Sequence, residues 1–260
     1  MYAYGGKAAS FTSLAGISFP MATLETGQKI TPLGDGWQSA DSQWDTGDPS
    51  YYLSNGVVHL SGSVYNPVNQ DWYFAGQLPQ AAWPAYSQVI NTYTYGGAPG
   101  QLLVDKGHTA YPPTPANEVD YMGAADDANS YGHANQYTSL AGITYPAAGS
   151  VETHLTPLNG WQPGTDTLEA NGPSYFISNG VVYLDGGVIN TGSGAVAALP
   201  PGARPTHTLY LTVGTGNGKW YPAVLQINPD GSMYTYGGPA SVYNDSNFTS
   251  FASISFEAGE

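Results

Sequence analysis

The chain has 260 residues, of which 41% are hydrophobic, 13% aromatic and 9% charged, and five basic side chains stand against nineteen acidic ones. A net charge of −14 repels phosphate backbones and anionic lipid, so we expect no nucleic-acid partner, and no apolar run is long enough to predict membrane insertion. The absence of cysteine excludes a disulfide framework and a thiolate metal site, and the content of Gly (34), Pro (20) and Tyr (21) favours turns and strands over helices.

The first twenty residues repeat the end of the chain. Met1-Tyr-Ala-Tyr-Gly-Gly6 matches Met233-Tyr-Thr-Tyr-Gly-Gly238, and Phe11-Thr-Ser-Leu-Ala-Gly-Ile-Ser-Phe19 matches Phe248-Thr-Ser-Phe-Ala-Ser-Ile-Ser-Phe256. We therefore assign residues 1–20 to the closing strand pair of a preceding module and expect the chain to be a segment of a longer polypeptide. The alternative is that this strand pair completes a sheet in a neighbouring subunit, as in strand donation.

Two copies of one module follow, over residues 21–146 and 147–260. A sixteen-residue stretch beginning at Pro49 is identical at eleven positions to the stretch beginning at Pro173. The Asn-Gly pair in each stretch predicts a β-hairpin with a type I′ turn, because both central residues of that turn need positive φ. Trp37 and Trp161 stand at matching places before these stretches, so we interpret both as core residues.

The residues after each Asn-Gly turn alternate in polarity. In the first copy Val58, Leu60, Gly62 and Val64 share one face, and His59 and Ser61 point the other way. In the second copy the apolar positions are 182, 184, 186 and 188, and Tyr183 and Asp185 take the opposite face. We expect a continuous strand with one buried face and one wet face, as in an antiparallel sheet that covers a core.

Each module closes with the same tail, which runs from Tyr137 to Tyr145 in the first copy. Its large apolar residues are spaced by three, three and two, which predicts a bulge or tight bend near Gly142. The modules differ mainly at residues 111–136, which we interpret as a surface loop. Short strands with frequent turn signals predict an all-β fold of tandem β-sandwich modules, jelly-roll-like, with almost no helix.

The ordered motifs also carry a resemblance. The segment from Pro32 to Trp37, the hairpin Asn-Gly-Val-Val-x-Leu-x-Gly, the segment Leu199-Pro-Pro-Gly-Ala-Arg-Pro205, Asp230-Gly231 and the closing tail together resemble β-sandwich modules of bacteriophage tail-fibre and minor tail proteins. The resemblance implies a virion protein, often trimeric, that contacts other virion proteins and has no catalytic residues to carry over. Arg204 has no counterpart in the first module, so we assign it a structural hydrogen bond at a turn.

The residues themselves give little support for an enzyme or a cofactor. The five histidines are scattered, and no nucleophile elbow or phosphate loop is present. For metals we expect no site. Weak calcium candidates are the acidic residues of two loops, since hard cations bind several loop oxygens. They are Asp41, Asp45 and Asp48 in the first loop and Asp126 and Asp127 in the second.

Carbohydrate binding has better support, because sugar rings stack on exposed aromatic faces. The candidates are aromatic residues present in one module and not in the other: Trp44, Trp72, Tyr73, Trp83 and Trp220. The alternative is that these side chains pack on a neighbouring subunit.

We therefore expect a non-enzymatic, tail-associated virion adhesin that is a homo-oligomer, with a trimer favoured, and that binds host-surface glycan. Two alternatives remain open: a capsid decoration or head-fibre protein, and a secreted carbohydrate-binding module.

Overall fold

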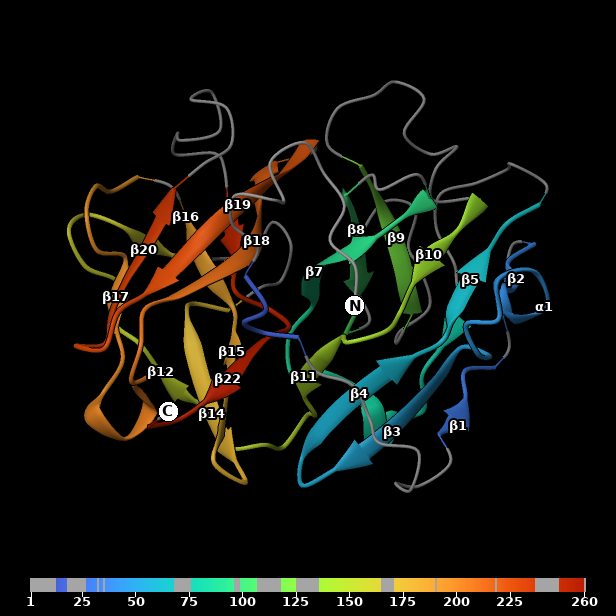
Figure 1. The fold of residues 1–260 in the computed structure, drawn as a ribbon, viewed down its shortest axis with the longest axis horizontal. Coiled ribbons are helices and arrows are strands. Elements are labelled where there is room, and N and C mark those ends of the chain that lie inside the picture. Colours follow the sequence, from blue (N-terminus) through green and yellow to red (C-terminus); the bar gives the residue numbers. More distant parts are fainter. Residues whose placement is uncertain are drawn as a thin grey trace.

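The computed structural model describes residues 13–17, 27–31, 33–34, 36–67, 76–95, 99–106, 118–124, 136–164, 171–189, 191–217, 219–236 and 248–259. They form antiparallel strands in several sheets (Figure 1), which confirms the predicted all-β, sandwich-like class. The helical elements named here are short: α1 (Asp41–Trp44), η1 (Gln80–Ala82) and η3 (Pro201–Ala203).

The strands of the first half form three sheets, with orders β1-β3-β4-β11, β10-β5-β2 and β6-β9-β8-β7. Their bounds are β1 (Gln28–Lys29), β2 (Gln38–Ser39), β3 (Ser50–Ser54), β4 (Val57–Ser61), β5 (Ser63–Tyr65), β6 (Gly76–Gln77), β7 (Gln88–Tyr93), β8 (Pro99–Val104), β9 (Glu118–Ala124), β10 (Thr138–Ser139) and β11 (Thr144–Pro146). An isolated bridge between Thr94 and Thr138 links the last two sheets, so together they face the first as one layer.

The strands of the second half form a four-stranded sheet, β12-β14-β15-β22, and a seven-stranded sheet, β13-β16-β21-β18-β19-β20-β17. Their bounds are β12 (Thr153–His154), β13 (Gln162–Pro163), β14 (Ser174–Ser178), β15 (Val181–Asp185), β16 (Gly187–Ile189), β17 (Ala197–Ala198), β18 (Leu209–Asn217), β19 (Lys219–Ile227), β20 (Ser232–Tyr236), β21 (Phe248–Ser250) and β22 (Ile254–Glu257). Strand by strand, this half repeats the first: β7, β8 and β9 correspond to β18, β19 and β20.

Each half has its own hydrophobic core, and Figure 1 shows the two sandwiches side by side. Trp37 is 4% exposed in the first core and Trp161 is 5% exposed in the second, so their predicted core role is confirmed. The Asn55-Gly56 turn has φ values of 50° and 80°, as the type I′ prediction requires. The predicted bend of the tail is also confirmed, because Gly142 has φ 80°.

The predicted continuous strand after the hairpin is wrong. Gly62 has φ 82° and separates β4 from β5, which belong to different sheets. A left-handed residue turns the chain across the sandwich corner, so the alternation does not continue and Ser63 and Val64 are both buried. Gly186, with φ 67°, makes the same corner between β15 and β16.

The loop predicted at residues 111–136 is also wrong in part, because residues 118–124 form β9, which pairs with β6 and β8. Residues 111–117 and 125–135 of that loop, and residues 1–12 and 18–20 of the predicted strand pair, lie outside the described residues.

The two sandwiches pack against each other through β11 and β15 and through β7 and β18 (Figure 1). Ser250 Oγ donates to the carbonyl oxygen of Val89 at 2.6 Å, and the Thr144 N–H donates to Ser253 Oγ at 3.0 Å. Part of the strand face that was predicted to be exposed to solvent therefore lies in the junction between the two sandwiches. Asp185 is 1% exposed, which corrects its prediction as a wet residue.

Candidate binding surface

Four aromatic side chains from distant parts of the chain gather at one edge of the first sandwich. The ring of Trp44 lies 5.5 Å from the ring of Tyr95 and 5.7 Å from that of Tyr137, and Tyr93 lies 5.8 Å from Tyr137. The interplanar angles are 60–68°, the edge-to-face geometry that aromatic quadrupoles favour. We call Trp44, Tyr93, Tyr95 and Tyr137 the aromatic cluster.

The cluster is exposed to solvent. Trp44 is 43% exposed, Tyr93 54% and Tyr95 40%. Large aromatic side chains are usually buried, so an exposed contiguous group of them is an informative feature of a surface. The rings hold one another in place and still present apolar area outward.

Backbone structure fixes the three segments that carry these rings. Trp44 ends the one-turn helix α1, which Asp45 terminates in the left-handed conformation with φ 52°. Tyr93 ends β7, and Tyr95 follows the Thr94 bridge to the tail. The Tyr95 N–H donates to the carbonyl oxygen of Tyr137 at 3.1 Å, which brings the third segment alongside. A surface supported in this way is preorganised for binding.

Polar residues flank Trp44 in the sequence, within α1 and at its C-terminal end. Ser42, Gln43 and Asp45 are all exposed. Hydroxyl, amide and carboxylate groups beside aromatic rings are the groups that orient the hydroxyls of a stacked sugar. The edge therefore combines exposed aromatic rings with neutral and acidic polar residues.

Of the other candidate aromatics, the structure describes the side chain of Trp83 alone, and it does not join this cluster. Trp83 is half-buried against the first core, and its indole N–H donates to the carbonyl oxygen of Leu78 at 3.0 Å. This is a packing role, so we leave Trp83 out of the platform. Trp72 and Tyr73 lie outside the described residues, and for Trp220 the structure describes the backbone in β19 and not the side chain.

The first group of calcium candidates is engaged in local contacts. Asp48 forms an ion pair with Lys29 at 2.5 Å and accepts a hydrogen bond from Ser39 Oγ at 2.7 Å. The hydrogen bond from Lys29, followed by that from Ser39, holds the pKa of Asp48 below its ordinary value. Asp41 accepts the N–H of Gly47 at 2.7 Å.

Among the residues that the structure describes, no three His, Asp or Glu side chains gather closely enough to hold a metal ion, so we do not pursue calcium at Asp41, Asp45 and Asp48. Asp126 and Asp127 lie outside the described residues.

No family model, curated protein or solved structure matches this chain. In the described part of the chain, no helix is long and apolar enough to cross a membrane. The function of the aromatic cluster is therefore argued from its own chemistry.

Arg204 takes the structural role expected for it, because its Nε donates to the carbonyl oxygen of Leu199 at 3.0 Å across the η3 turn. Sequence reasoning found Trp44 and missed Tyr93, Tyr95 and Tyr137. The two modules differ at these positions as they do at Trp44: Tyr93 aligns with Gly214 and Tyr95 with Gly216, as the equivalent Thr94 and Thr215 bridges to the tails indicate. That difference was the signal that could have found them.

Proposed function

We propose that the protein is a non-enzymatic adhesin of a virion that binds host-surface glycan through the aromatic cluster. The observation that supports it is an exposed edge of four mutually packed rings, bordered by polar side chains of α1. Such an edge provides a stacking surface with hydrogen-bonding groups beside it, and it needs no catalytic group or cofactor.

A single shallow platform of this kind binds weakly. Copies displayed together raise the effective concentration of the second contact, so an oligomer on a particle binds a repetitive polysaccharide far more tightly than one chain does. This is the physical reason for proposing a displayed virion protein rather than an isolated binding domain.

The assignment to a virion rests on the resemblance to phage tail modules. Immunogold electron microscopy with antibodies against residues 21–260 distinguishes the alternatives. Label at tail tips supports the adhesin, label over the head supports a decoration or head-fibre protein, and absence of label on particles supports a secreted carbohydrate-binding module.

Replacing Trp44 by Ala is expected to weaken binding to bacterial cell-surface polysaccharide on a glycan array by about fivefold, since one stacking contact contributes about 1 kcal/mol. The fold should survive, because Trp44 is exposed. Tyr236→Ala is the matched control: Tyr236 is also exposed, at 41%, and it lies on β20 of the other sandwich. Equal binding by the Trp44→Ala, Tyr236→Ala and unmodified chains would rule out the cluster as the platform.

A further inference from the structure

The tail motif occurs three times in the chain, and its three copies adopt the same turn. The amide of Ala15 donates to Ser13 Oγ at 3.3 Å, that of Ala141 to Ser139 Oγ at 3.2 Å, and that of Ala252 to Ser250 Oγ at 3.2 Å. The next residue is left-handed in every copy, with φ 75° at position 16, 80° at 142 and 63° at 253. The segment 13–17, which we call the first tail, is thus folded as the end of a module.

Ala15 of the first tail packs against the second core, and the two large apolar side chains of the described segment 13–17 lie outside both cores. Leu14 is 57% exposed and Ile17 is 56% exposed. Their counterparts are buried in the two sandwiches. The residues equivalent to Leu14 are Leu140, which is 1% exposed, and Phe251, which is 0% exposed; those equivalent to Ile17 are Ile143, at 3%, and Ile254, at 7%. The side chains that each complete module places in its interior therefore lie on the surface here.

The contact between neighbouring tails occurs twice, at equivalent positions. Ser253 of the last tail contacts Thr144 of the middle tail, as its hydroxyl accepts the Thr144 N–H. In the repeat, Gly16 of the first tail is equivalent to Ser253, and Ser255 of the last tail is equivalent to Thr144. A β-carbon at Gly16 would lie 3.6 Å from the carbonyl oxygen of Ser255. The first tail therefore lies against the last tail at the same positions through which the last tail contacts the middle tail.

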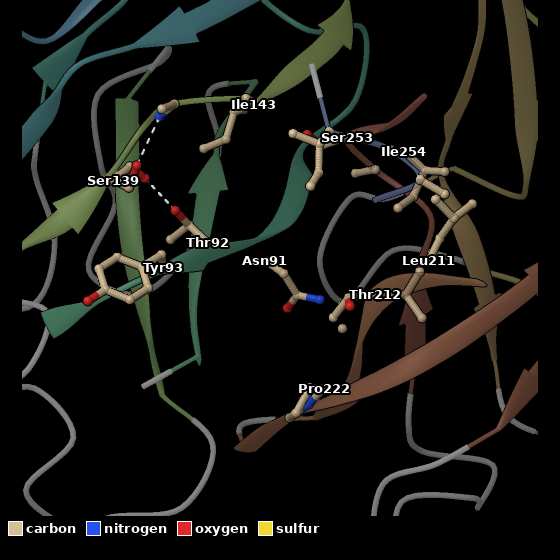
Figure 2. Close-up of a pocket in the computed structure, with 18 of the residues that line it drawn as sticks. Asn91, Thr92, Tyr93, Ser139, Ile143, Leu211, Thr212, Pro222, Ser253 and Ile254 are labelled. Atoms are coloured by element: carbon tan, nitrogen blue, oxygen red, sulfur yellow. Dashed lines mark hydrogen bonds between the residues drawn. The ribbon is translucent and has the colours of Figure 1, made fainter. Parts of the chain in front are cut away.

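All three tails meet at one cavity of about 700 Å³ (Figure 2), whose lining includes the equivalent pairs Ala15 and Gly16, Ala141 and Gly142, and Ala252 and Ser253. Asn91 of β7 and Thr212 of β18, which are equivalent in register, line it as well. Contacts at equivalent positions around a common cavity suggest an arrangement with three places, two of which the sandwiches occupy.

Among the described residues, the second sandwich is more exposed at two positions whose counterparts in the first sandwich are covered. Val89 of the first sandwich is 2% exposed under the last tail, and its counterpart Tyr210 is 38% exposed. A β-carbon at Gly56, in the first hairpin tip, would lie 3.5 Å from Phe176 of the second sandwich, and one at the equivalent Gly180 would have nothing within 4 Å. Within the described part of the chain, the second sandwich therefore covers the first at these two positions, and no described segment covers the second in the same way.

We propose that this face binds a third β-sandwich module of the same repeat, whose core takes Leu14 and Ile17, and that the three modules close a pseudo-threefold ring around the cavity. A second copy of this chain does not fit the place, because each of its sandwiches already contains its own tail, at residues 137–145 or 248–256, and so offers no vacant core. The inference is independent of glycan binding.

The sequence repeat supplies the test. Met1 aligns with Met233, so residues 147–232 joined to Met1 of the full chain recreate a module that ends in the first tail. We expect the fused chain to stay monomeric in sedimentation, and amide hydrogen exchange in residues 13–17 and 209–213 to slow by roughly a hundredfold relative to the unfused chain.

The double variant Leu14→Ser with Ile17→Ser is the control. In the unfused chain it should leave the melting temperature unchanged, because both side chains are exposed; in the fused chain it should abolish the protection. Equal exchange of residues 13–17 in fused and unfused chains would overturn the proposal, as would protection of that segment in a dimer of the unfused chain.

Discussion

Replacing Gly186 by Ala is expected to lower the free energy of unfolding by about 3 kcal/mol or more. Gly186 has φ 67°, and the left-handed region costs an L-residue about 1–2 kcal/mol. The added β-carbon would also lie 2.2 Å from the carbonyl oxygen of Gly172 and 2.6 Å from that of Asn171. Both are backbone atoms, so relief requires the chain to move, and such overpacking typically costs about 1–3 kcal/mol.

Gly180→Ala is the matched control for this substitution. Gly180 has φ 80°, and a β-carbon there meets no atom within 4 Å, so it carries the backbone strain without the clash. We expect a loss of about 1 kcal/mol. Urea unfolding of both variants measures the difference, and equal losses would mean that the segment at residues 171–172 yields without cost. Gly62, whose β-carbon would lie 2.2 Å from the Asp48 carbonyl oxygen, should behave as Gly186 does.

Local sequence signals predicted the parts of this fold that local chemistry determines. The Asn-Gly turns, the tail bend at Gly142 and the cores around Trp37 and Trp161 depend on backbone preferences and on apolar residues repeated in both copies. The corner at Gly62 was not predicted, because a glycine at a corner and a glycine at an inward position of an alternating strand look the same in the sequence. Only the φ angle distinguishes them. Strand β9 was not predicted because its sequence is too far from that of β20 to align.

The candidate site was less predictable, because it depends on contacts between segments far apart in the chain. Trp44 could be identified from the sequence because it occurs in one module and not in the other. Its partner rings are brought to it by the Thr94–Thr138 bridge, which is a tertiary contact. The ring inference has a similar origin. The repeat predicted that residues 11–19 are the end of a module, and only the structure shows that the side chains of Leu14 and Ile17 are exposed.

The junction between the sandwiches contains a buried acid, Asp185. Its Oδ2 accepts a hydrogen bond from Gln88 Nε2 of the first sandwich at 3.2 Å, and its Oδ1 accepts the Gly186 N–H at 2.5 Å. Burial, reinforced by the negative charge of Glu152, raises the pKa of Asp185 to about 8, despite the two donors that lower it. Near neutral pH the folded protein therefore holds a proton on this carboxyl, and the unfolded chain does not.

We expect stability to fall as pH rises between about 4 and 8. In this window the folded state binds one more proton than the unfolded state, so the free energy of unfolding decreases with pH by up to about 1.4 kcal/mol per unit. Below the window both states are protonated at this carboxyl, and above it neither is. The carboxyls of Asp48 and Asp230 have lowered pKa values, so their stabilisation is lost only as pH falls below about 4, outside this window.

Asp185→Asn should remove this slope, because the amide resembles the neutral acid in shape and cannot ionise. Urea unfolding at pH 5, 6.5 and 8 should give a stability that declines for the unmodified chain and stays nearly level for the variant. Glu152→Gln is the companion variant: without the neighbouring charge the pKa of Asp185 falls, so the decline should end at a lower pH. Parallel pH profiles of the unmodified and Asp185→Asn chains would contradict the assignment. Because Gln88 contacts Asp185 across the junction, ionisation at alkaline pH acts on the packing of one sandwich against the other, the same packing that the proposed ring requires.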